Sequence, residues 1–315
     1  MFIQLQILLI AILVSVACAL PGVFLVLRGV ALMSDAISHA ILPGIAIMFL
    51  LVHKLDSPLL IVGASLAGLL TVFFTEALIQ TGRIAKDAAI GLVFPLFFSV
   101  GVIIISQYAR NVHLDIDMVL LGELAFTPFS RLVIYGYDVG PQAAWVMGTI
   151  LIINFLFICL FFKELALITF DATQARIFGF WPGILHYGLM TITSITAVGA
   201  FDVVGSIVVV ALMITPPATA YLLTRRLPHM VLMSVLIGIA ACVLGYLCAL
   251  YCDVSIAGSI ATMAGLLFVG ALLFSPLNGL FMRRYFRSNQ HVALADSMNF
   301  DFLQMPGRGK EDLGQ

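Results

Sequence analysis

The chain has 315 residues, of which 62% are hydrophobic and only 10% are charged. Its mean hydropathy of +1.15 excludes an ordinary soluble domain and indicates an all-α polytopic membrane protein. The net charge of −1 provides no basic patch for nucleic acid, because the few basic residues lie at the ends of apolar runs.

Apolar runs long enough to cross a bilayer recur along most of the chain. A spanning helix needs about 20 apolar residues, and by this criterion we predict nine spans. They are residues 3–27, 30–52, 58–80, 89–107, 143–163, 184–201, 203–223, 230–252 and 257–281. The sixth and seventh share one apolar stretch, so a total of eight is the alternative.

The two ends of the chain differ in composition. The first apolar run resembles a signal sequence, but it lacks a basic leading segment, so we predict an uncleaved first span. The polar residues 288–315 are predicted to form a disordered cytoplasmic tail. A transmembrane domain is therefore predicted over residues 1–287.

Basic residues mark every second boundary between the predicted spans. Loops rich in lysine and arginine stay in the cytoplasm. These residues are Arg28, Arg83, Lys86, Lys163, Arg176, Arg225, Arg226, Arg283, Arg284 and Arg287. The alternate connections, including a predicted turn at Phe201–Asp202, carry little positive charge. The pattern predicts an N-terminus outside and a C-terminus inside.

The second predicted span contains two ionisable side chains, in the sequence RGVALMSDAISHAILPGIAIM of residues 28–48. In a helix, Asp35 and His39 are one turn apart and share an arc with Ser34 and Ser38. A carboxylate inside a bilayer costs about 2.5–3.5 kcal/mol on insertion scales. It therefore needs a partner or a water-filled path.

A carboxylate and a neutral imidazole together suit a divalent metal such as Mn²⁺, Fe²⁺ or Zn²⁺. The pair Asp35 and His39 is too small for a complete site, so two copies facing each other across a two-fold axis are expected. Pro43 removes the hydrogen bond to the carbonyl of His39 and predicts a kink there. The alternative is an aspartate at the water interface and a histidine bonded within the bundle.

Two further groups of charged residues lie at opposite ends of the predicted spans. Glu76 ends the third span and is expected to pair with Arg83 or Lys86 at the cytoplasmic boundary. The outer connection of residues 108–142 holds a second group, which could collect cations or contact an external partner. A solvated acidic loop is the equal alternative. The second group is His113, Asp115 and Asp117.

The inner connection of residues 166–182 predicts one short helix. Asp171 followed by Gln174 resembles a capping box, and Gly179 is a suitable stop, so we expect a helix over Ala172–Phe178. Its apolar side, made of Ala172, Ala175 and Phe178, is expected to dock a soluble partner. The alternative is an interfacial helix that lies on the lipid.

Several motifs of catalysis and energy conversion are missing from the sequence. It contains no GxxxxGK[ST] motif for ATP, no HExxH motif and no GxSxG motif. Chemistry on a substrate is therefore not expected. Energy for transport has to come from an ion gradient or from another subunit.

Four stretches resemble the permease subunits of bacterial metal-uptake ABC transporters, which import manganese, zinc or iron. They are RGVALMSDAISHAILPGIAI (28–47), KDAAIGLVFPLFFSVGVII (86–104), FDATQARIFG (170–179) and VVGSIVVVALMITPPATAYLLT (203–224). The resemblance implies a type II importer-like permease in the bacterial inner membrane. It also implies a second, identical or homologous permease, separate ATPase subunits that hydrolyse ATP, and an extracytoplasmic metal-binding protein.

The resemblance also assigns roles to particular residues. Asp35 and His39 match the family's Asp-x-x-x-His on the helix that lines the pore. The segment that contacts the ATPase is matched by Asp171, Ala172, Thr173, Gln174, Ala175, Arg176, Ile177, Phe178 and Gly179. No cofactor is implied beyond the transported ion.

Two other classes of function compete with this interpretation. A secondary carrier would use an ion gradient and titrate Asp35 during its cycle. A membrane enzyme would use Asp35 and His39 as an acid–base pair, but the sequence offers no convincing third catalytic group. The donor set of carboxylate and imidazole accepts manganese, iron or zinc and does not select one of them.

Overall fold

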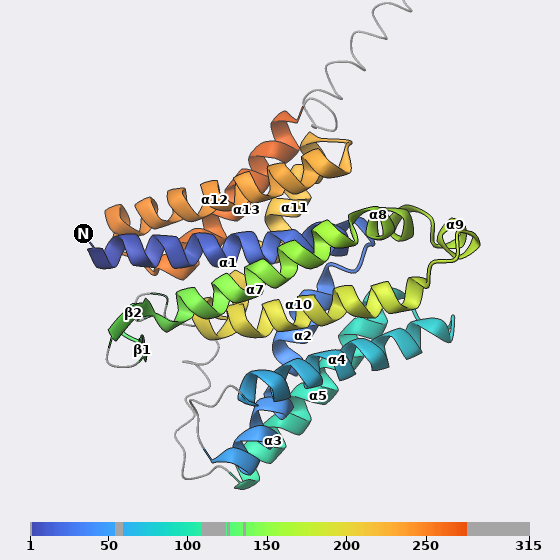
Figure 1. Cartoon of the computed structure of the whole chain (residues 1–315), viewed down its shortest axis with the longest axis horizontal. Coiled ribbons are helices and arrows are strands. Elements are labelled where there is room, and N and C mark those ends of the chain that lie inside the picture. Colours follow the sequence, from blue (N-terminus) through green and yellow to red (C-terminus); the bar gives the residue numbers. More distant parts are fainter. Residues whose placement is uncertain (1, 54–58, 109–123, 125–126, 135–136, 276–315) are drawn as a thin grey trace, which may run out of the picture.

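The computed structural model describes the chain except residues 1, 54–58, 109–123, 125–126, 135–136 and 276–315. Within the described part, nine helical segments are long and apolar enough to cross a membrane. The prediction of nine spans is therefore confirmed (Figure 1). The elements are α1 (Phe2–Leu27), α2 (Leu32–Ala40), α3 (Leu42–Val52), α4 (Leu59–Gln80), α5 (Lys86–Tyr108), β1 (Arg131–Ile134), β2 (Tyr137–Pro141), α7 (Gln142–Leu160), α8 (Phe162–Phe170), α9 (Ala172–Ile177), α10 (Pro182–Val204), α11 (Ser206–Leu223), α12 (Leu227–Cys252) and α13 (Ile256–Phe274).

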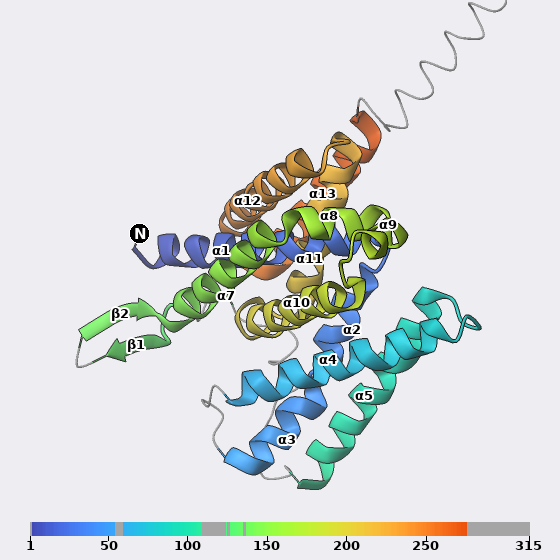
Figure 2. The same cartoon turned by 45° about the vertical axis from the view of Figure 1, so that its right-hand side comes forward.

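Helix α1 forms the centre of the bundle. It packs against α7, α10, α11 and α12, and side chains on several of its faces, including Ile10, Ala11 and Ala19, are buried. A helix that is apolar all round is typical of such a buried position. Helices α12 and α13 lie on one side of α1, and α3, α4 and α5 gather on the far side beyond α10 and α2 (Figures 1 and 2).

The second predicted span is broken into α2 and α3. The break lies at Ile41, and Pro43 occupies the first turn of α3, where a missing backbone N–H costs no helical hydrogen bond. The kink predicted from Pro43 is therefore present. Helices α3, α4 and α5 pack tightly against one another next to this break.

Glycine permits the closest approaches in this part of the bundle. A Cβ atom added at Gly101 on α5 would lie 2.7 Å from the backbone nitrogen of Pro43, and one added at Gly44 would meet the carbonyl oxygen of Gly63. Small residues at helix interfaces allow backbones to touch inside a membrane, where dispersion contacts replace the hydrophobic effect. These contacts hold the kinked span against α4 and α5.

One local prediction was wrong, and two local elements were not predicted. The sixth predicted span does not turn at Phe201–Asp202, because α10 continues to Val204 and the chain turns at Gly205 with φ of 80°. Glycine adopts this backbone conformation without the steric cost of a Cβ atom. Helix α8 and the antiparallel hairpin β1–β2 were not predicted. The hairpin lies at the opposite end of α7 from α8 and α9 (Figures 1 and 2).

The contact at Gly101 generates a stability prediction. Gly101→Ala places a methyl group against the backbone of Pro43, and overpacking of this kind costs about 1–3 kcal/mol, so the thermal unfolding midpoint in detergent should fall. Gly91→Ala, on the same helix, is the control because nothing lies within 4 Å of its added Cβ atom. Equal midpoints for the two variants would contradict the tight packing of α5 on the kink.

Candidate metal site

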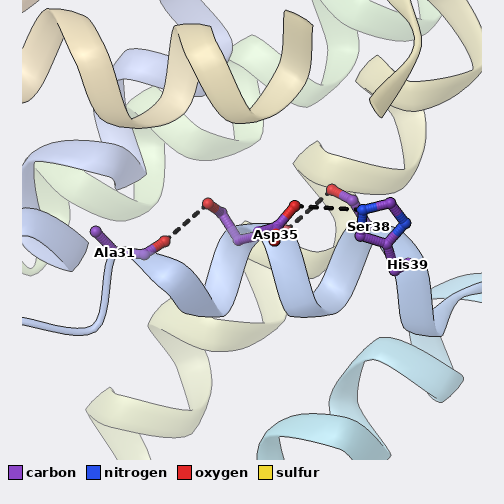
Figure 3. Close-up of polar contacts among 5 residues, drawn as sticks. Ala31, Asp35, Ser38 and His39 are labelled. Atoms are coloured by element: carbon purple, nitrogen blue, oxygen red, sulfur yellow. Dashed lines mark hydrogen bonds and ion pairs between the residues drawn. The ribbon is translucent and has the colours of Figure 1, made fainter. Parts of the chain in front are cut away.

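The two ionisable side chains of α2 lie side by side. The Nε2 atom of His39 is 3.4 Å from Oδ1 of Asp35 (Figure 3). Their side chains are 30% and 38% exposed, respectively, although the segment Leu32–Val52 has the length and hydropathy of a membrane span. The pair is therefore accessible from outside the single chain rather than enclosed in its core.

The two serines of the same helix face the protein interior instead. Ser34 donates a hydrogen bond to the carbonyl of Ala31, and Ser38 donates one to the carbonyl of Ser34, both at 2.9 Å (Figure 3). Ser34 and Ser38 are almost fully buried. The polar arc predicted from the sequence therefore has two parts. Ser34 and Ser38 are buried and hydrogen-bonded to backbone carbonyls, whereas Asp35 and His39 are accessible.

Aromatic rings from α5 flank the imidazole. The ring centroid of His39 is 5.9 Å from that of Phe94 and 6.4 Å from that of Phe98. Such apolar walls limit the access of water on one side of His39 and restrict its orientation. They leave the Nε2 atom of His39 next to Asp35.

The described residues of one chain provide too few donors for a closed metal site. Among the described residues, no group of three or more histidine, cysteine, aspartate or glutamate side chains could hold a metal ion. Asp35 and His39 offer one carboxylate and one imidazole, whereas structural and transport sites for Mn²⁺ or Zn²⁺ use four or more ligands. A metal ion bound to this pair would need further ligands from another molecule or from water.

The structure reveals a second polar cluster at the junction between α1 and α2. Arg28 donates from Nε to Oγ1 of Thr169 at 3.2 Å and from Nη1 to Nδ1 of His186 at 3.0 Å. His186 Nε2 lies 3.6 Å from Oε2 of Glu76. Burial lowers the pKa of the Arg28 guanidinium from 12.5 to about 10, so it remains charged at neutral pH.

This cluster corrects one prediction and adds a residue that sequence reasoning missed. Glu76 contacts His186 rather than pairing primarily with Arg83 or Lys86. The missed residue is His186, and the sequence pattern that could have indicated it is an imidazole in the first turns of an apolar span. Its partner Glu76 lies 110 positions away in the sequence. Only the packing of α10 on α4 brings the two side chains together.

The predicted inner helix is present as α9. The Oδ1 atom of Asp171 accepts hydrogen bonds from the backbone N–H groups of Thr173 and Gln174, both at 2.9 Å. Gly179 follows with φ of 82°. The cap and the stop predicted from the sequence are therefore both observed, with the helix ending at Ile177 instead of Phe178.

The exposed apolar surface of α9 differs from the predicted one. Ala175 was expected on the docking side, but it is fully buried, because it faces the rest of the protein. Ile177 and Phe178 are 79% and 69% exposed. These two side chains, rather than Ala175, offer the apolar contact surface.

The remaining candidate residues are not placed. His113, Asp115 and Asp117 lie outside the described residues, and so does the predicted tail of residues 288–315.

The fold and the paired side chains define a multi-pass membrane protein with an ionisable pair accessible within one span. The profile of the ABC 3 transport family matches residues 2–275, and the chain belongs to this family. It is a permease subunit of the metal-uptake ABC transporters, which confirms the resemblance seen in the sequence.

Two curated relatives and one solved structure are similar over most of their length. The manganese transport system membrane protein MntD of Bacillus subtilis is 44% identical over 87% of this chain and 92% of its own. The zinc transport system membrane protein TroD of Treponema pallidum is 49% identical over 88% of this chain and 76% of its own. A chain of PsaBC from Streptococcus pneumoniae, solved in complex with Fab, matches with a TM-score of 0.72 and 31% identity, covering 90% of this chain and 94% of that one.

The capping hydrogen bonds of α9 generate a prediction. Asp171→Ala removes a cap worth about 0.5–2 kcal/mol, so the amides of Thr173 and Gln174 should exchange hydrogen for deuterium about 2- to 30-fold faster. Asp171→Asn is the matched control, because asparagine caps helices equally well. Unchanged exchange in Asp171→Ala would show that the cap does not hold α9 in place.

Proposed function

We propose that this chain is the membrane-spanning subunit of an ATP-driven importer that moves Mn²⁺, Fe²⁺ or Zn²⁺ from an extracytoplasmic binding protein into the cytoplasm. The observation that carries this proposal is the accessible pair of Asp35 and His39 within a membrane span. Relatives named as manganese and zinc transport system membrane proteins support the class of ion.

The proposed transport site is shared by two permeases. A second identical or homologous chain would place its own carboxylate and imidazole opposite Asp35 and His39. Two carboxylates then balance the charge of one divalent cation, and four donors approach a complete coordination shell. The partial exposure of both side chains in the single chain supports this arrangement, because a site closed within one subunit would be buried.

ATP hydrolysis is assigned to separate subunits that dock on α9. The chain has no phosphate-binding motif of its own. The exposed side chains of Ile177 and Phe178 provide an apolar contact on a short, capped helix. In this proposal, the ATPase contact segment runs from Asp171 to Gly179.

The proposed orientation places α9 in the cytoplasm of a bacterial cell. Arg28 and Arg176 lie in two separate connections and Lys86 begins α5, yet all three line one cavity of about 430 Å³. Positively charged connections between spans remain on the cytoplasmic side. With nine spans, this assignment leaves the N-terminus outside.

Replacement of the paired ligands should abolish transport. Asp35→Asn and His39→Gln should each lower the uptake of radioactive manganese in uptake-deficient cells by about 10-fold or more, because losing even a supporting group costs 10- to 100-fold in metal affinity. Asp87→Asn and His229→Gln are matched controls at exposed positions. Normal uptake by Asp35→Asn and His39→Gln at equal membrane levels would overturn the proposed site.

The energy source separates this proposal from a gradient-driven carrier. Proteoliposomes that contain the complex should take up manganese only when ATP is supplied on the side of α9, and ionophores should have no effect. Uptake by the isolated chain that is abolished by an ionophore would establish the carrier instead.

A further inference from the structure

Arg28 connects two segments that the proposed transport cycle has to coordinate. It lies in the connection between α1 and α2, and its backbone leads directly into the helix that carries Asp35. Its side chain reaches Thr169 on α8, two positions before the cap residue Asp171 of α9. Arg28 therefore links the connection that precedes α2, which carries Asp35 and His39, to helix α8, which precedes the proposed docking helix α9.

The second contact of Arg28 fixes the state of an imidazole. A guanidinium can only donate hydrogen bonds, so Nδ1 of His186 has to accept the one from Nη1 at 3.0 Å. The imidazole proton then resides on Nε2, which faces the Oε2 atom of Glu76 at 3.6 Å. The result is a series of contacts from the Arg28 guanidinium, through the neutral His186 imidazole, to the Glu76 carboxylate.

These side-chain contacts join four parts of the bundle. Arg28 belongs to the α1–α2 connection, Thr169 to α8, His186 to α10 and Glu76 to α4. Their side chains line the same cavity as Lys86 and Arg176, which add positive charge. Glu76 supplies the one carboxylate among the described lining residues, so it is the negative charge that faces the cationic side chains of this cavity.

The contacts are specific to arginine and to this geometry. Arg28 uses two different nitrogens for two partners on different helices, which a lysine ammonium on a flexible stem does not reproduce as a rigid fork. Thr169 in turn donates to the carbonyl of Leu165 at 2.6 Å, which leaves its oxygen lone pairs free to accept from Arg28.

We infer that Arg28, oriented by His186 and Glu76, is a positioning residue that couples α8 and α9 to the start of α2. A displacement of α9 by the ATPase is transmitted through Thr169 to Arg28 and from there to the helix that carries Asp35 and His39. The inference rests on the proposed function and adds to it the mechanical link between ATP hydrolysis and the metal pair.

The test compares ATP use with metal transport in the complete complex. Thr169→Val removes the acceptor for Arg28 at nearly constant volume, and Arg28→Lys keeps the charge but loses the fork. Each should increase the amount of ATP hydrolysed per manganese ion imported into proteoliposomes by about 2- to 30-fold, the range by which residues between two sites change their coupling. Arg83→Gln, an exposed residue at the α4–α5 turn, is the control for loss of a positive charge.

A double substitution tests whether Arg28 and Glu76 act as one unit. Glu76→Gln should raise the same ratio, and combining it with Arg28→Lys should add little, because residues of one network are not additive. A purely structural role predicts lower thermal stability with an unchanged ratio of ATP to metal, and this result would overturn the inference.

Different results would refute the proposed import function and the coupling role of Arg28. A wild-type complex that imports no manganese with ATP would refute the proposed function itself. A wild-type complex that imports manganese, with Thr169→Val and Arg28→Lys showing the wild-type ratio, would refute only the coupling role of Arg28.

Discussion

A carboxylate and an imidazole on a helix inside a bilayer have to be compensated, and this requirement explains the construction of α2. The cost of an unpaired carboxylate at the centre of a spanning helix is about 2.5–3.5 kcal/mol on insertion scales. In the part of the chain that the structure describes, the ionisable partner of Asp35 is His39, at 3.4 Å, while the neighbouring serines bond to backbone carbonyls of their own helix or its first turn. The pair therefore keeps donors available for a ligand from outside the single chain, which is the property that a transient metal site needs.

Three other ionisable side chains, Arg28, His186 and Glu76, have contacts with one another within the chain. Arg28, His186 and Glu76 form a continuous sequence of contacts in which the cation and the carboxylate stand at opposite ends of a neutral ring. The cluster of Arg28, His186 and Glu76 therefore differs from the accessible pair of Asp35 and His39. The cluster connects α4, α8, α10 and the α1–α2 connection, whereas the side chains of Asp35 and His39 are partly exposed.

Local sequence signals predicted the elements that depend on neighbouring residues. Nine apolar runs, the cap at Asp171, the stop at Gly179 and the break near Pro43 all follow from helix chemistry within a few positions, and all are observed. The contact between Glu76 and His186 could not be predicted in this way, because it depends on which helices become neighbours. The predicted exposure of Ala175 was wrong for the same reason: the side of α9 that faces the protein is decided by the packing of α8 and α10.

The most direct test of the account is an anomalous-scattering map of the assembled complex, recorded at the absorption edge of bound manganese. The account predicts a single peak between the two permeases, with the Asp35 carboxylate and the His39 imidazole of each permease, or the equivalent residues of a homologous partner, at coordination distance. A peak bound by other residues, with Asp35 and His39 directed into helix packing or lipid, would contradict it.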